Sequence, residues 1–125
     1  MIVADSDVLV DALRGREPAA GRIAEAIRSG SLATTSISVF ELLSGAKRPT
    51  ERSKVERLLR PLVIFPFDER ASLAAAQARR SLEATGTGIG MADYLIAGVC
   101  LTRSAPLLTR NREHFQRIPG LHLLS

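Results

Sequence analysis

Short apolar runs alternate with longer segments of helical spacing along the whole of this sequence. The runs lie at residues 2–4, 32–35, 63–65, 107–108 and 121–124. Between them, apolar residues recur every three or four positions, as on one face of a helix. Strands that alternate with helices favour a parallel sheet covered on both faces. We therefore predict an α/β fold, a three-layer α/β/α sandwich with a central parallel sheet, in which all 125 residues form a single domain.

Polar residues that follow the apolar runs indicate where helices begin. Ser6 or Asp7 is expected to cap the helix after the first run, because Ser and Asp are favoured helix caps. The helix after the second run is expected to start at Ser36 or Ser38. Residues 91–101 are apolar on almost every side, which predicts a helix that is buried over most of its surface. Ligands in such folds bind beyond the carboxyl ends of the strands, so we look there for chemistry.

The composition excludes several classes of protein. Cys100 is the single cysteine and cannot form an internal disulfide, which excludes a secreted disulfide-rich scaffold and fits a reducing compartment. No apolar run approaches the roughly 20 residues that a membrane-spanning helix needs. The first residues also lack the basic and apolar pattern of a signal peptide. We expect a soluble, cytoplasmic protein that does not contact a membrane.

The charge balance gives a weaker indication of the partner. The chain has 17 basic and 13 acidic residues, and Lys47 and Lys54 are its only lysines. Guanidinium groups match phosphate oxygens in pairs, so a surface rich in arginine suits a polyanion. A GC-rich coding sequence produces the same excess of arginine over lysine, so a polyanionic partner and codon bias both remain open as interpretations. Aromatic residues make up only 4% of the chain, which disfavours a platform for stacking single-stranded bases.

Three acidic residues lie in apolar surroundings. Asp5 ends an apolar run, Glu41 lies among core-type residues, and Asp93 is near the start of the most apolar segment. An unpaired buried carboxylate is costly, and no Lys or Arg lies within five residues of Glu41 or Asp93. A divalent metal ion would neutralise all three. Oxygen ligands without Cys or His suit Mg²⁺ or Mn²⁺.

Each of these acids, taken alone, also has an ordinary structural interpretation. Asp5 would supply hydrogen bonds to the helix that follows it, and Glu41 would lie on a solvated stripe of its helix. Asp93 would be a helix cap close behind Gly90. The joint interpretation is stronger, because a parallel sheet brings strand ends and first helical turns together at one edge.

Four segments resemble, in order, the motifs of PIN-domain proteins. They are residues 2–11 (Ile-Val-Ala-Asp-Ser-Asp-Val-Leu-Val-Asp), 35–45 (Thr-Ser-Ile-Ser-Val-Phe-Glu-Leu-Leu-Ser-Gly), 90–97 (Gly-Met-Ala-Asp-Tyr-Leu-Ile-Ala) and 108–121, which contains Thr-Arg-Asn-Arg-Glu-His-Phe and then Ile-Pro-Gly-Leu. Each motif alone is weak, but four in order from residue 2 to the C-terminus are specific. The length of the chain and the residues of the four motifs together most resemble the VapC-type toxins of bacterial toxin–antitoxin pairs.

The resemblance implies a metal-dependent endoribonuclease whose catalytic acids are Asp5, Glu41 and Asp93. It implies that Asp5 and Asp93 bind Mg²⁺ or Mn²⁺ directly, and that Glu41 does so directly or through water. Asn111 falls at a fourth position where many relatives have Asp, which puts a second metal ion in doubt. The implied partners are an RNA substrate, an antitoxin protein from the adjacent gene and a second copy of the chain in a homodimer.

Several neighbouring polar residues have open roles. Ser6 is expected either to hydrogen-bond near the acids or to cap a helix. Asp7 and Asp11 are expected to be helix-cap and surface residues. Glu113 is a weak candidate to compensate for the missing acid at Asn111, and His114 is expected to be structural or to support a metal ligand.

Two other functions compete with this prediction. Asp5-Ser6-Asp7 after a strand mimics the start of a Mg²⁺-dependent, haloacid-dehalogenase-like phosphatase, but such an enzyme needs a later lysine and none follows Lys54. The other is a catalytically silent module that only binds RNA or an antitoxin. The presence of all three acids argues against a silent module, whereas Asn111 at the fourth position weakly favours one.

Overall fold

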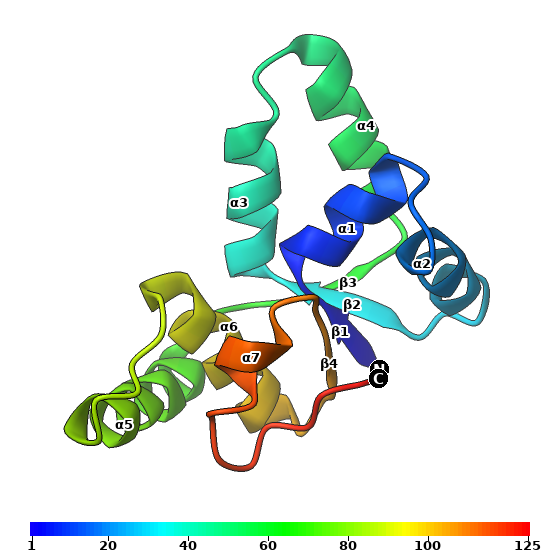
Figure 1. Cartoon of the computed structure of the whole chain (residues 1–125). Coiled ribbons are helices and arrows are strands. Elements are labelled where there is room, and N and C mark those ends of the chain that lie inside the picture. The colour runs from blue at the N-terminus through cyan, green and yellow to red at the C-terminus, as the bar shows by residue number, and fades with distance from the viewer.

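The computed structural model describes residues 1–125 and contains one sheet of four parallel strands (Figure 1). The order across the sheet is β3-β2-β1-β4, with the strands at β1 (Ile2–Ala4), β2 (Leu32–Thr35), β3 (Val63–Phe65) and β4 (Leu107–Leu108). Val3 pairs with Ala33 on one side and with Leu107 on the other. The predicted parallel sheet is confirmed, and β1 has a neighbour on each side.

Helices cover both faces of this sheet (Figure 1). They are α1 (Ser6–Leu13), α2 (Ala19–Arg28), α3 (Ser36–Gly45), α4 (Pro49–Leu59), α5 (Glu69–Ala84), α6 (Met91–Arg103) and α7 (Arg112–Phe115). Along β1, Ala4 packs in a cluster with residues of α1 to α4, whereas Val3 packs in a second cluster with residues of α5 to α7. Successive strand residues therefore face opposite helical layers, and the predicted α/β/α sandwich is confirmed.

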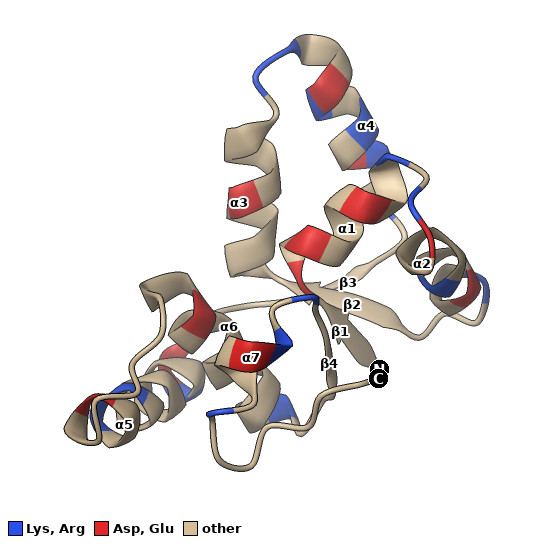
Figure 2. Cartoon of the chain, viewed as in Figure 1, with Lys and Arg blue, Asp and Glu red and all other residues tan.

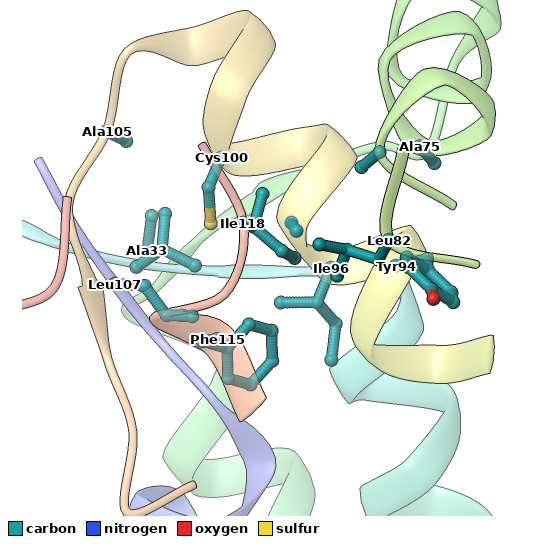
Figure 3. Packing of buried hydrophobic residues seen from close by; sticks show 13 residues of the cluster. Ala33, Ala75, Leu82, Tyr94, Ile96, Cys100, Ala105, Leu107, Phe115 and Ile118 are labelled. Atoms are coloured by element: carbon teal, nitrogen blue, oxygen red, sulfur yellow. The ribbon is translucent and has the colours of Figure 1, made fainter. Parts of the chain in front are cut away.

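The second cluster is built around α6 (Figure 3). Ile96 and Cys100 of α6 are buried against Leu107 of β4 and Phe115 of α7, as the apolar sequence of this helix predicts. Burial raises the pKa of the Cys100 thiol to about 12, so this cysteine stays protonated. Although α6 is buried on most sides, no helix of the structure combines the length and hydropathy that a membrane span requires.

The helices that follow β1 and β2 begin at Ser6 and Ser36. The start of α3 at Ser36 is as predicted, but the cap of α1 is Asp5 and not Ser6 or Asp7. Asp5 caps α1 by accepting a hydrogen bond from the backbone N–H of Ser6, and Thr35 caps α3 by accepting one from that of Ser38. In both places the last extended residue carries the capping oxygen, so strand and helix join without a loop.

The chain after β4 differs from the prediction in two ways. α7 was not foreseen, and the strand expected at residues 121–124 is reduced to one bridge between Leu107 and Leu123. Two hydrogen bonds of 2.9 Å join Leu107 to His122 and Leu124. Because β4 contains only two residues, it offers no partner for a longer strand.

The contact between α5 and α6 depends on Gly98. A Cβ atom at this position would lie 2.4 Å from the Ala71 carbonyl oxygen and 2.9 Å from the Ala75 Cβ. We expect Gly98→Ala to lower the free energy of unfolding by about 1–3 kcal/mol, because the helices must separate. A urea titration measures this loss. Gly45→Ala is the matched control, since nothing lies within 4 Å of a Cβ there, and equal stability losses in both variants would contradict the prediction.

Candidate active site

Asp5 lies at the carboxyl end of β1 and is only 6% exposed. Its Oδ1 accepts a hydrogen bond of 2.8 Å from the Ser6 backbone N–H. Its Oδ2 accepts one of 2.8 Å from the Thr109 hydroxyl, which follows β4. The carboxylate is therefore held between the two neighbouring strands β1 and β4, at the edge where such sheets bind ligands.

The surroundings of Asp5 favour its protonated form. The pKa of its carboxyl group is raised from 3.8 to about 7, mainly by burial, then by the nearby charge of Asp7, with a smaller contribution from that of Glu41. The hydrogen bonds from Thr109 and Ser6 act in the opposite direction but do not compensate. A carboxylate with this pKa, at the end of a central strand, is a candidate functional group.

Glu41 reaches this carboxylate through Ser6. The Ser6 hydroxyl donates a hydrogen bond of 3.2 Å to the Glu41 Oε1 atom, while its backbone N–H binds Asp5. Ser6 is the first residue of α1 and not its cap, so it contacts two of the three predicted acids. Glu41 is half-buried and, with Ser6, lines a cavity of about 450 Å³ between α1, α3 and α4.

Asp93 lies in the first turn of α6, where Gly90 and not Asp93 occupies the capping position. Its side chain is 19% exposed. Its Oδ2 lies 3.3 Å from the Asn111 Nδ2 and 3.3 Å from the His114 Nδ1, and these two nitrogens are 3.0 Å apart. The structure therefore brings Asn111 and His114 onto the third predicted acid, and the interpretation of Asp93 as a helix cap is wrong.

Thr109 connects the two halves of the site. Its hydroxyl donates to Asp5 and accepts a hydrogen bond of 3.0 Å from the backbone N–H of Asn111, which in turn contacts Asp93. No role was predicted for Thr109 from the sequence. The available signal was its position, because it follows β4 as Asp5 follows β1.

Asp7 and Asp11 hold the segment after β4 in place. Asp7 Oδ2 accepts a hydrogen bond of 3.0 Å from the Arg110 backbone N–H, and Asp11 Oδ2 lies 2.9 Å from the Arg110 Nε. Asp11 is only 7% exposed, so its assignment to the surface is wrong. Asp7 also does not cap its own helix, because its carboxylate binds the distant Arg110.

Glu113 points away from this cluster. Its side chain is 80% exposed and lies 3.5 Å from the guanidinium of Arg117. The structure does not bring it to Asn111, so Glu113 does not replace the missing acid.

The donor atoms at this edge suit a hard cation, but they do not form a closed site. Figure 2 shows acidic residues on α1, α3 and α6, and their side chains offer carboxylate oxygens. The Asp7 Oδ1 atom is buried without any hydrogen-bond partner, which is the state of an oxygen that a cation would satisfy. No group of three or more Asp, Glu, His or Cys side chains lies close enough together to hold a metal ion as it stands.

Comparison with known proteins identifies the family of this fold and site. Residues 2–121 match the family model described as the PIN domain. The chain belongs to the PIN-domain family. The four sequence motifs that resemble this family therefore lie within one continuous match.

This PIN domain is similar to proteins named as ribonucleases. It is 36% identical to Ribonuclease VapC10 of Mycobacterium tuberculosis strain H37Rv, over 92% of this chain and 86% of that protein. It is 34% identical to Ribonuclease VapC19 of the same organism, over 97% of both chains. A chain in the crystal structure of VapBC2 from Rickettsia felis, bound to a DNA fragment from their promoter, superposes with a TM-score of 0.90 at 28% identity, covering 99% of this chain and 98% of that one.

The raised pKa of Asp5 predicts a pH dependence of stability. Between about pH 4 and about pH 7, the native state keeps a proton on Asp5 that the unfolded state releases, so this group lowers the free energy of unfolding as the pH rises. We expect Asp5→Asn to remove that slope in EDTA. At higher pH the variant should be more stable than the wild type, by at most about 4 kcal/mol.

Urea titrations at several pH values, each carried out in EDTA, measure this difference. Glu113→Gln is the control, because it removes an exposed carboxylate outside the cluster and should keep the wild-type slope. Identical pH profiles for the wild type and Asp5→Asn would refute the prediction.

Proposed function

We propose that residues 1–125 act as one PIN domain with divalent-metal-dependent endoribonuclease activity, and that the protein is the toxin of a toxin–antitoxin pair. The observation that carries this proposal is the buried Asp5 at the end of β1, with a pKa of about 7 and with hydrogen-bonded connections to Glu41 and Asp93. The similarity to ribonucleases VapC10 and VapC19 supports RNA as the substrate.

Asp5 and Asp93 would bind Mg²⁺ or Mn²⁺ directly, Glu41 would do so directly or through water, and Asn111 would offer an amide oxygen. The bound ion would lower the pKa of a water molecule and neutralise charge at the phosphate that is cleaved. Thr109 and Ser6 hold the Asp5 carboxylate in one orientation, and Ser6 also positions Glu41. Asp93 is oriented by Asn111 and His114.

The proposed partner is an antitoxin encoded by the adjacent gene, with an arginine that reaches Asp5, Glu41 or Asp93. A guanidinium makes strong paired hydrogen bonds to carboxylates and would replace the charge of the metal ion. The similarity to a chain of the VapBC2 structure supports such a partner. We place the protein in the cytoplasm as a homodimer, and co-purification with the product of the adjacent gene tests the partner.

Removal of the metal ion or of one of its ligands separates the enzyme from a silent binding module. We expect EDTA to abolish cleavage of total bacterial RNA, and Mg²⁺ or Mn²⁺ to restore it. Asp93→Asn should abolish cleavage, yet its melting temperature in EDTA should equal or exceed that of the wild type. The amide keeps the volume of the side chain and removes one charge from an acidic edge.

Glu113→Gln is again the matched control and should cleave RNA normally, since its carboxylate is 80% exposed and lies outside the cluster. Cleavage by the wild type in excess EDTA would exclude the metal mechanism. An active Asp93→Asn variant, or an inactive one that melts far below the wild type, would remove Asp93 from the proposed site.

Asn111→Asp should tighten metal binding and destabilise the metal-free fold. The Asn111 Nδ2 is 3.3 Å from Asp93 Oδ2, so the substitution places two carboxylates against each other. Like charges at this distance repel in the absence of a cation and attract one more strongly than an amide does. Calorimetry with Mn²⁺ and thermal melts in EDTA measure the two effects.

Gln116→Glu is the control for added charge, because Gln116 is exposed just beyond α7. It should change neither the affinity for Mn²⁺ nor the melting temperature appreciably. Equal Mn²⁺ affinity for Asn111→Asp and the wild type would place Asn111 outside the reach of the metal ion.

A further inference from the structure

A second cavity, of about 540 Å³, lies next to the acidic site and is not used by the mechanism above. Its walls come from α1, the start of α2, the segment after β4, α7 and the last residues of the chain. Three of its lining residues are basic, namely Arg22, Arg110 and Arg112, and Asp11 is the only acidic one. We call this space the arginine cavity.

The charge of the arginine cavity differs from that of the cavity that contains Glu41. Among the residues that line the Glu41 cavity, two basic side chains, Arg14 and Lys54, are balanced by two acids, Glu41 and Glu51. The arginine cavity instead has a formal charge of +2 from its side chains. A polyanion that reaches the acidic edge is therefore attracted towards the arginine cavity.

Two of these arginines, Arg22 and Arg112, have N–H donors that bind no other residue of the protein. Arg22 donates to the backbone oxygen of Ser125, and Arg112 donates to that of Leu124. A guanidinium has five N–H donors, and both side chains belong to exposed residues, so most of their donors face solvent. Arg110 is different, because Asp11 already neutralises it.

The position of the cavity relates it to the reaction. Thr109 lines it and also donates to Asp5, and the cavity's Arg110 and Arg112 flank Asn111 in the sequence. The backbone N–H of Arg110 donates to Asp7 and its side chain pairs with Asp11, so the segment between β4 and α7 lies against the acidic side chains of α1. A phosphate in the cavity would therefore be near a phosphate at Asp5.

We propose that the arginine cavity binds a backbone phosphate of the RNA next to the bond that is cleaved, with Arg22 and Arg112 as the phosphate-binding side chains. This inference rests on the proposed function, because it takes the substrate to be RNA. Arginine matches phosphate oxygens in pairs, and contacts of this kind supply affinity and register but not base specificity.

The test measures RNA binding separately from cleavage. Arg22→Gln and Arg112→Gln are titrated with end-labelled, unfractionated bacterial tRNA in EDTA, and fluorescence anisotropy is followed at several salt concentrations. We expect each substitution to weaken binding about tenfold and to lower the slope of log affinity against log salt by about one. With Mn²⁺ present, KM should rise while kcat is retained.

Two sets of controls accompany these variants. Arg80→Gln removes the same charge from an exposed position on α5, in the opposite helical layer, and should bind RNA like the wild type. Arg22→Lys and Arg112→Lys keep the charge and should keep the salt dependence. The lysine variants also serve if the loss of the contacts to Ser125 or Leu124 unfolds a glutamine variant.

The outcomes distinguish this inference from the proposed function. RNA binding and cleavage by the wild type, with Arg22→Gln and Arg112→Gln unchanged like Arg80→Gln, would overturn the inference alone. A wild-type protein that neither binds nor cleaves RNA would overturn both. Loss of affinity for the antitoxin with unchanged affinity for tRNA would assign the cavity to an acidic protein segment and overturn the inference.

Discussion

The burial of one carboxylate, that of Asp5, determines how the rest of the site is arranged. β1 has a strand on each side, so the residue that follows it is enclosed by the sheet and the first turn of α1. A buried carboxylate must be hydrogen-bonded, and here the partners are Ser6 and Thr109. Each partner makes a second hydrogen bond, Ser6 to the Glu41 carboxylate and Thr109 with the backbone N–H of Asn111. The whole hydrogen-bonded cluster therefore depends on the position of Asp5 at the end of β1.

This arrangement places the site across all three layers of the sandwich. Glu41 comes from α3 in one helical layer, Asp93 from α6 in the other, and Asp5 from the end of the sheet between them. The two hydrophobic clusters lie on opposite faces of the sheet, and Ile37 of α3 also packs against the cluster around α6. Each cluster therefore helps to position one acid relative to Asp5. The distance between Glu41 and Asp93 is consequently sensitive to the packing of both layers, and a substitution in either cluster can change the site without contacting it.

The sequence was sufficient to predict the parallel sheet and the sandwich, because these depend on local patterns. It also singled out three acids, whose catalytic role stays a prediction. Strands and helices follow from apolar periodicity, and an acid such as Asp93 is conspicuous within an apolar helix. The roles of Thr109 and Asp7 were not predictable in this way. The contacts of Thr109 with Asp5 and of Asp7 with Arg110 join residues more than 100 positions apart, and only the pairing of β1 with β4 creates them.

The acids of α1 and its cap are unequally compensated, which links stability to ligand binding. Arg110 pairs with Asp11, but no basic side chain forms an ion pair with Asp5 or Asp7, and one oxygen of Asp7 is buried without a partner. Their mutual repulsion contributes to the raised pKa of Asp5 and opposes folding at neutral pH. A cation at this edge, whether the proposed metal ion or a partner's guanidinium, would bind the native state and not the unfolded one, and so would stabilise the fold by mass action. The same repulsion that destabilises the free protein therefore favours the binding of either cation.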